Sequence, residues 1–106
     1  MTNPCMQTIE DILCSYTLYK EIVPYKGEID YEKKRITINP AFDMIETLAH
    51  EILHHYYDIT LKTGATEWFV RENARELIKD KEVSEIIKKY TEKAKPMPSK
   101  NIFSTV

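Results

Sequence analysis

The sequence predicts a single α+β domain: an N-terminal helix, a β-hairpin, a central helix, and one or two C-terminal helices. Two observations favour this class. Apolar residues recur at helical spacing before residue 24 and after residue 42, and at a period of two in between. At 106 residues the chain suits one hydrophobic core, since domains usually run to roughly 100 to 150 residues. We place the domain at residues 1–95 and expect residues 96–106 to be a C-terminal tail, because Pro96 and Pro98 are typical of a linker.

The N-terminal helix is predicted to begin at Asn3 and Pro4, because Asn is a good N-cap and Pro suits the first helical position. Its apolar stripe extends to Tyr19, and Pro24 ends it. The stripe consists of Ile9, Ile12, Leu13, Tyr16 and Tyr19.

A period of two then predicts the β-hairpin over residues 25–39. Apolar side chains alternate with charged ones on both sides of a polar turn at residues 32–34. The inward residues are Ile29, Tyr31, Ile36 and Ile38. We expect residues 35–39 to form the exposed edge strand of this unit, positioned to hold an extended peptide by backbone hydrogen bonds.

The central helix is predicted over residues 43–59, after Pro40 breaks the strand. Asp43 and Glu46 have the spacing of a capping box. A wide apolar arc indicates that the helix is buried on most sides. The arc contains Ile45, Leu48, Ala49, Ile52, Leu53 and Tyr56.

The C-terminal part is predicted to be helical from Thr66 onward. A turn that contains Gly64 precedes it. The apolar phase slips near residues 79–81, which predicts either a kink or a second helix. The two stripes are Phe69, Val70, Ala74, Leu77 and Ile78, then Val83, Ile86, Ile87 and Tyr90.

Composition and charge exclude several classes of function. The net charge is −2 and no basic stripe is visible, so we expect no nucleic-acid partner. No run approaches the roughly 18 apolar residues of a membrane span, and the first residues do not resemble a signal peptide. Cys5 and Cys14 lie too far apart along one helix for a disulfide. We expect reduced thiols and a cytoplasmic protein.

The central helix carries an H-E-x-x-H motif at His50, Glu51 and His54. Residues four apart stack on one face of a helix, so the two imidazoles can bind one Zn²⁺ while Glu51 acts as a general base. Buried polar groups without partners are costly, and a metal would give these side chains partners. The motif predicts a zinc hydrolase.

A catalytic zinc needs a third protein ligand. The motif that continues with Gly and a third His is absent, because Tyr57 and Thr60 occupy those positions. A glutamate from the following helix is the remaining common solution. Glu67 lies about 60° from the apolar direction of that helix, compared with about 120° for Glu76 and about 160° for Glu72.

Helical phase therefore favours Glu67, which also sits in the first turn where the helix dipole favours a negative charge. Glu72, Glu76 and Asp58 remain alternatives. A second donor to the reacting carbonyl oxygen is also needed. The candidates are Tyr25, Tyr56, Tyr57 and His55, and none of them is preferred by the sequence.

Residues 47–54 read T-L-A-H-E-I-L-H, and the helix that follows places Glu67, Val70, Ala74 and Leu77 at characteristic intervals. This pattern resembles the compact zincins of phages and their bacterial hosts, the ImmA/IrrE-type metallopeptidases and their short phage relatives. The resemblance covers residues 25–80. It implies a minimal zincin-like fold, with His50, His54 and Glu67 as zinc ligands and Glu51 as the base.

We therefore expect a zinc-dependent metallopeptidase whose partner is a protein or peptide substrate, such as a regulatory protein. The alternative is a non-catalytic, zincin-like binding module that regulates a phage or host protein. Replacing Glu51 with glutamine separates the two hypotheses, because only a peptidase needs that carboxylate as a base.

Overall fold

The computed structural model describes residues 3–97, and this part of the chain confirms the α+β class. It contains four α-helices: α1 (Met6–Cys14), α2 (Met44–His55), α3 (Glu67–Leu77) and α4 (Lys81–Lys93). A π-helical segment, η1 (Tyr56–Thr60), directly follows α2. The strands are β1 (Thr17–Lys20), β2 (Gly27–Asp30), β3 (Arg35–Ile38) and β4 (Lys95–Pro96).

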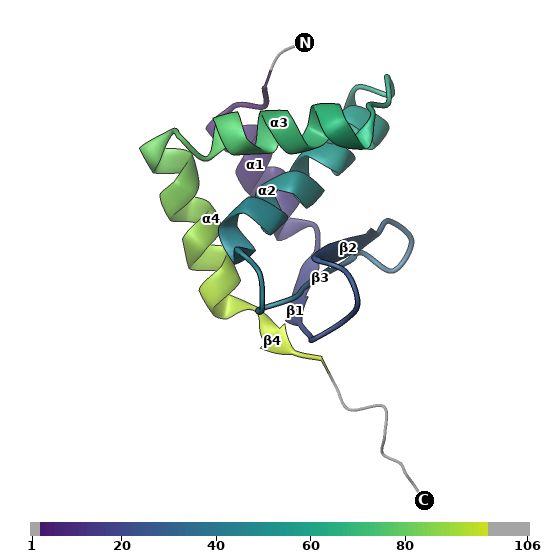
Figure 1. Cartoon of the computed structure of the whole chain (residues 1–106). Helices are drawn as coiled ribbons and strands as arrows, with labels where there is room; N and C mark the ends of the chain where they lie inside the picture. The colour runs from purple at the N-terminus through teal and green to yellow at the C-terminus, as the bar shows by residue number, and fades with distance from the viewer. Residues whose placement is uncertain (1–2, 98–106) are drawn as a thin grey trace, which may run out of the picture.

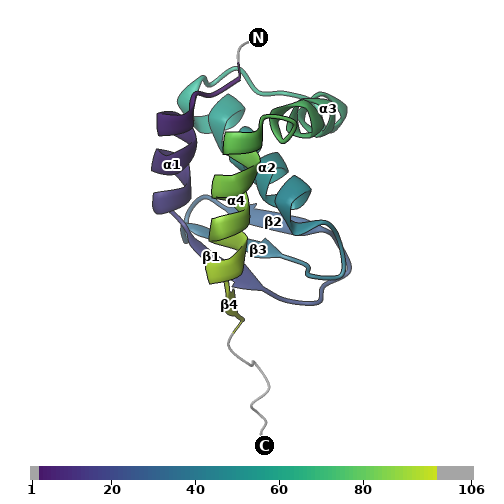
Figure 2. The same ribbon diagram turned by 90° about the vertical axis from the view of Figure 1, so that its left-hand side faces the viewer.

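The four strands form one sheet in the order β2-β3-β1-β4. The predicted hairpin is confirmed, because β2 and β3 pair antiparallel with Ile29 opposite Ile36. Strand β1 pairs parallel with both β3 and β4. The helices gather on one face of the sheet, with α3 farthest from it and α2 crossing between (Figures 1 and 2).

Helix α2 lies at the centre of the core. It contacts α1, α3, α4 and the two strands of the hairpin. Four of the six residues in the predicted apolar arc are completely buried, while Ile45 and Tyr56 are partly buried. The completely buried residues are Leu48, Ala49, Ile52 and Leu53. A helix packed on so many sides is a rigid support for the polar side chains on its remaining face.

The helix starts follow the capping rules. Asp43 accepts hydrogen bonds from the backbone N–H groups of Ile45 and Glu46, which confirms the predicted start of α2. Thr66 caps α3 in the same way. Asp80 caps α4, so the phase slip is the start of a second helix rather than a kink. The first helix starts later than predicted, with Cys5 as its N-cap.

The predicted extension of the first helix to Tyr19 is wrong. Helix α1 ends at Cys14, and β1 follows after Ser15 and Tyr16. Tyr19 of β1 lies three residues after Tyr16, so its position happens to match the helical spacing of the stripe. Pairing with β3 satisfies the backbone N–H and C=O groups of β1, and this contact is not visible in a local pattern.

The predicted edge strand is also wrong. Strand β3 is internal because β1 pairs with its other side, and the edge strand of the hairpin is β2. The expected tail contributes to the sheet as well: Pro96 pairs with Lys20, while residues 98–106 lie outside the described range. Among residues 3–97, no helix has the length and apolar character needed to cross a membrane.

Candidate metal centre

The polar face of α2 points to the groove between the hairpin and α3. Helical spacing places His50 and His54 one turn apart on this face, with ring centroids 4.7 Å apart. Helix α3 packs on α2, and its first residue is Glu67. The cap at Thr66 fixes where α3 begins and therefore where the Glu67 side chain lies.

The structure brings His50, His54 and Glu67 together. One oxygen of Glu67 lies 2.9 Å from Nε2 of His50, and the other lies 2.7 Å from Nε2 of His54. The two Nε2 atoms are 3.0 Å apart. These three side chains form a group that could hold a metal ion. The geometry agrees with the choice of Glu67 by helical phase.

The alternative carboxylates lie elsewhere. Glu72 pairs with Arg75 at 3.2 Å, and Glu76 pairs with Lys79 at 2.7 Å. Asp58 does approach the centre, but from behind: its Oδ2 lies 3.9 Å from Nδ1 of His54, the ring nitrogen that faces away from Glu67. At this distance it makes no hydrogen bond to the imidazole, and it is not a member of the group that could hold a metal ion.

A tyrosine holds Asp58 in that position. The Tyr31 hydroxyl donates a hydrogen bond of 2.9 Å to Oδ2 of Asp58. Burial, and then this hydrogen bond, raise the pKa of Tyr31 well above its ordinary value. Asp58 belongs to the π-helical segment, a type of segment that often occurs at functional sites. Carboxylates behind metal-binding histidines commonly fix the ring orientation.

Glu51 is buried beside this group, with only 6% of its surface exposed. Burial raises the pKa of its carboxyl to about 8, and the nearby charges of Glu67 and Glu28 add to the effect. The backbone of β2 passes close to Glu51 at Gly27. A Cβ atom added to Gly27 would lie 3.3 Å from Glu51 and only 2.5 Å from Cγ2 of Thr47. Glycine is therefore the residue that lets β2 approach α2 so closely.

The pKa values of His50 and Glu67 are shifted by burial and by the neighbouring charged groups. Desolvation lowers the pKa of His50, and the neighbouring His54 lowers it further. Partial burial acts to raise the pKa of Glu67, but the charges and hydrogen bonds of His54 and His50 bring it below its ordinary value. A neutral imidazole and an ionised carboxylate are the forms in which these side chains bind metals.

These residues line one cavity of about 420 Å³. Helix α2 forms its floor, and the hairpin and α3 form its walls. The lining residues are Tyr25, Lys26, Gly27, Ile29, Tyr31, Glu46, Thr47, His50, Glu51, His54, Glu67 and Arg71. A cavity of this size is within the range of pockets that bind small ligands or peptide side chains.

The comparisons with known proteins returned nothing. No protein-family model matches the chain, and neither a curated protein nor a solved structure matches it significantly. The function must therefore be argued from the site.

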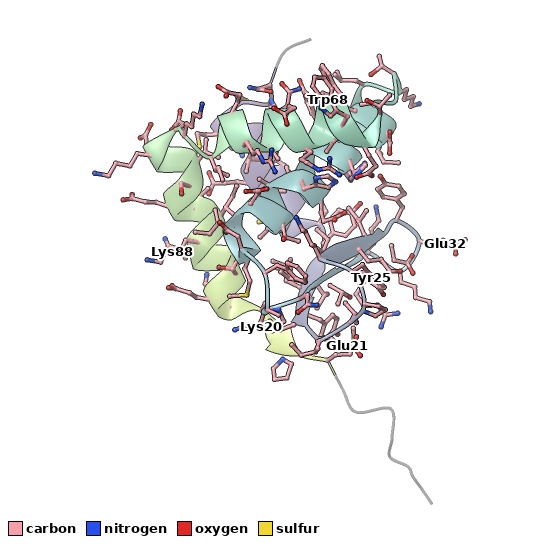
Figure 3. All side chains as sticks on the ribbon, viewed as in Figure 1. Lys20, Glu21, Tyr25, Glu32, Trp68 and Lys88 are labelled. Carbon is pink, nitrogen blue, oxygen red and sulfur yellow. The ribbon has the colours of Figure 1, made fainter. Side chains whose placement is uncertain are left out.

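The predicted donors to a reacting carbonyl occupy different places. Tyr25 lines the cavity and donates a hydrogen bond to Glu28; Figure 3 shows it in the loop before β2. Tyr56 and Tyr57 are not among the lining residues, and Tyr57 is fully buried. His55 is also buried, with its Nδ1 2.7 Å from the Tyr16 hydroxyl.

Tyr31 and Asn39 contribute to the site in ways that the sequence does not predict. The alternating pattern places Tyr31 in the hairpin core, and the structure shows that it also lines the cavity. Asn39 directly follows β3. Its side-chain amide donates to the carbonyls of Val23 and Tyr25, which holds the loop that carries Tyr25 against the sheet. The signal in the sequence is an Asn directly before a Pro, because Asn side chains commonly form hydrogen bonds with nearby backbone groups.

Proposed function

We propose that this protein is a zinc-dependent metallopeptidase with a minimal zincin-like fold. In this proposal His50, His54 and Glu67 bind Zn²⁺, and Glu51 is the general base. The observation that supports it best is the convergence of three metal-binding side chains beside a buried carboxyl in an accessible cavity. The resemblance of residues 25–80 to the ImmA/IrrE-type metallopeptidases agrees with the same assignment.

The donor set suits zinc. Two imidazoles and one carboxylate are a known ligand set of catalytic zinc sites, whereas structural sites usually have four protein ligands. Zinc bonds of roughly 2.0 to 2.2 Å require ligand atoms about 3.3 Å apart in a tetrahedral arrangement. Here the two Nε2 atoms are 3.0 Å apart, and each lies 2.7 to 2.9 Å from a different oxygen of Glu67, so small side-chain adjustments would bring the three ligands to that spacing.

The proposed reaction is the hydrolysis of a peptide bond. When bound, zinc polarises the peptide carbonyl and lowers the pKa of a water molecule towards neutrality. Glu51 accepts a proton from the attacking water and delivers it to the leaving amine. Burial raises the pKa of Glu51 to about 8 in the metal-free site, and a cation bound beside it would lower that pKa towards neutrality, which suits a group that first accepts and then returns a proton.

The free edge of β2 gives the substrate a place to bind. Strand β2 forms one wall of the cavity, and its outer edge pairs with no other strand among residues 3–97. An extended peptide can pair with such an edge through backbone hydrogen bonds. The peptide would then lie along the groove, with one of its carbonyl groups near Glu51.

Glu51→Gln tests the proposal. The variant keeps the shape of the side chain but cannot act as a base, so we expect it to bind zinc as the wild type does and to lose hydrolysis of peptide substrates. Zinc content is measured by elemental analysis, and hydrolysis by mass spectrometry of a digested peptide mixture. Glu72→Gln, on the same helix as Glu67 but paired with Arg75, is the matched control and should remain active.

Two outcomes would contradict the proposal. Zinc-loaded wild type that cleaves no peptide would favour the non-catalytic binding module. A Glu51→Gln variant that cleaves as fast as the wild type would exclude Glu51 as the base.

A further inference from the structure

The hairpin wall of the cavity runs along α2 in a defined direction. At one end, Gly27 lies against Thr47 and Glu51. At the other end, Tyr31 reaches Asp58, just beyond the end of α2. Strand β2 therefore runs in the same direction as α2, and residues before Gly27 lie near the N-terminal half of that helix.

The α3 wall runs the opposite way. Its first residue, Glu67, contacts both His50 and His54, while Arg75 bonds to Glu46 two turns earlier on α2 than His54. Arg71 lies midway between Glu67 and Arg75 and lines the cavity. Four residues of helix span about 6 Å, so Arg71 stands about 6 Å along the groove from the metal-binding carboxylate.

The charge of Arg71 is not matched by its surroundings. Arg75 pairs with both Glu46 and Glu72, but Arg71 forms no ion pair or side-chain hydrogen bond with any residue in the range 3–97.

Two of the carboxylates that line the cavity are engaged by other side chains. The Glu46 carboxylate is held by Arg75, and the Glu67 carboxylate is held by the histidines. The second cation of the lining, Lys26, comes from the loop before β2 and lies 5.7 Å from the ring of Phe42. Two cations thus flank the end of the groove that lies over the N-terminal half of α2.

From this placement we propose that Arg71 determines substrate specificity by binding a carboxylate of the peptide, with Lys26 adding positive charge from the opposite wall. The inference rests on the proposed peptidase function, because it assigns the preference of the same groove. The carboxylate is that of an acidic side chain or that of the C-terminus of the peptide.

The geometry limits where that carboxylate lies. Side chains on one face of an extended peptide repeat at about 6.6 to 6.8 Å, close to the spacing between Glu67 and Arg71. Arg71 therefore contacts a group within one or two residues of the scissile bond. The planar guanidinium can bind a carboxylate with two parallel hydrogen bonds, which a lysine cannot do.

The test compares peptides that differ by a single charge. Internally quenched peptides carry Glu or Gln at one position at a time near the cleaved bond, with the C-terminus either free or amidated. Charged hydrogen bonds in such a partly exposed site are expected to favour the acidic peptide by about tenfold in kcat/KM. Arg71→Ala should remove this preference, so that the Glu and Gln peptides are cleaved with equal kcat/KM. Arg71→Glu should favour Lys at the same position.

Arg75→Ala is the matched control, because it removes an arginine one turn away that does not line the cavity. A preference that depends on Glu within the peptide identifies a side-chain carboxylate, and one that depends on the free C-terminus identifies the terminal group. An acidic preference that persists in Arg71→Ala, or no preference in the wild type, would overturn the inference.

A binding measurement separates this inference from the proposed function. Fluorescence anisotropy with the zinc-loaded Glu51→Gln variant reports the affinity for Glu and Gln peptides without turnover. If the acidic peptide binds in an Arg71-dependent way but the wild type cleaves no peptide, the carboxylate site is supported and the peptidase function is contradicted. If the wild type cleaves peptides and neither binding nor cleavage depends on Arg71, the peptidase function is supported and the carboxylate site is contradicted. No binding and no cleavage would overturn both.

Discussion

His54 and Glu67 lie 2.7 Å apart, from Nε2 to Oε2, across the contact between α2 and α3. The two histidines share one helix, but the carboxylate comes from the next one. The group of three therefore exists only when α3 is packed on α2. Metal binding and the docking of α3 are expected to stabilise one another, because a ligand that binds only the folded form shifts the equilibrium towards it.

Glu67→Ala should lower zinc affinity by at least about a hundredfold, since loss of even an indirect contact to a metal ligand typically costs 10- to 100-fold. Zinc at 100 times its Kd should stabilise the wild type by about 2.7 kcal/mol and leave this variant nearly unchanged. Competition with a chromophoric chelator measures the first quantity, and thermal unfolding with and without zinc measures the second. Glu76→Ala is the control, because Glu76 pairs with Lys79 away from the centre. Equal affinity of Glu67→Ala and wild type would exclude Glu67 as a ligand.

The metal-free protein should lose stability between pH 4.5 and 8 because of Glu51. The folded state raises the pKa of this carboxyl from 4.5 to about 8, so the folded form binds more protons than the unfolded form in this window. The free energy of unfolding therefore falls as the pH rises through it. Relative to Glu51→Gln, the wild type should be less stable by on the order of 3 kcal/mol at pH 7.

Urea unfolding in the presence of a chelator, repeated from pH 4 to 8.5, measures this difference. The two proteins should converge at the acidic end, where Glu51 is protonated in both states. Glu85→Gln, an exposed position on α4, is expected to follow the wild-type profile. Parallel profiles for wild type and Glu51→Gln would show that the burial of Glu51 carries no electrostatic cost.

Gly27→Ala should destabilise the protein by about 1 to 3 kcal/mol, which is typical of overpacking. The added Cβ would lie 2.5 Å from Cγ2 of Thr47, so either β2 or α2 must shift. Thr47→Ser removes that methyl group, and the double variant should recover most of the loss. A double-mutant cycle from urea unfolding measures the coupling.

Gly64→Ala is the control: Gly64 has a φ of +72° and open space around it, so Thr47→Ser should not rescue that variant. Additive losses for Gly27→Ala and Thr47→Ser would show that the two residues do not collide.

Asp58→Asn should weaken zinc binding by about tenfold without abolishing it, because a carboxylate behind a histidine orients the ring and raises its basicity. Tyr31→Phe should have a smaller effect in the same direction, since it removes only the hydrogen bond that holds Asp58. Chelator competition gives both affinities. Asp11→Asn changes the same charge on α1, where Asp11 bonds to Gln7, and should bind zinc as the wild type does. An affinity for Asp58→Asn equal to that of wild type would remove Asp58 from the centre.

Local patterns predicted the elements that carry the site. The start of α2 followed from Asp43, the start of α3 from Thr66, and the hairpin from the alternation around Ile29 and Ile36. Spacing of four residues placed His50 and His54 on one face. Helical phase favoured Glu67 over Glu72 and Glu76, because the direction in which a helical side chain points depends only on its position in the helix.

Contacts between distant residues explain the errors. Residues 17–20 form a strand because residues 35–38 lie beside them, and a four-residue strand is too short to show its period against a helical stripe. The same pairing makes β3 internal and leaves β2 as the edge. Arg75 pairs with Glu46 whereas Arg71 forms no ion pair within residues 3–97, and that pairing depends on how α3 lies on α2.

The sequence by itself determined the chemistry that is available: two histidines at helical spacing, a glutamate between them and a limited set of carboxylates after them. Only the tertiary structure decided which carboxylate meets the histidines, which strand faces the cavity and which arginine of α3 forms no ion pair within residues 3–97. Side-chain identity and helical phase are local properties of the chain. The meeting of α2, α3 and β2 depends on burying their apolar faces in one core, and no short segment specifies that arrangement.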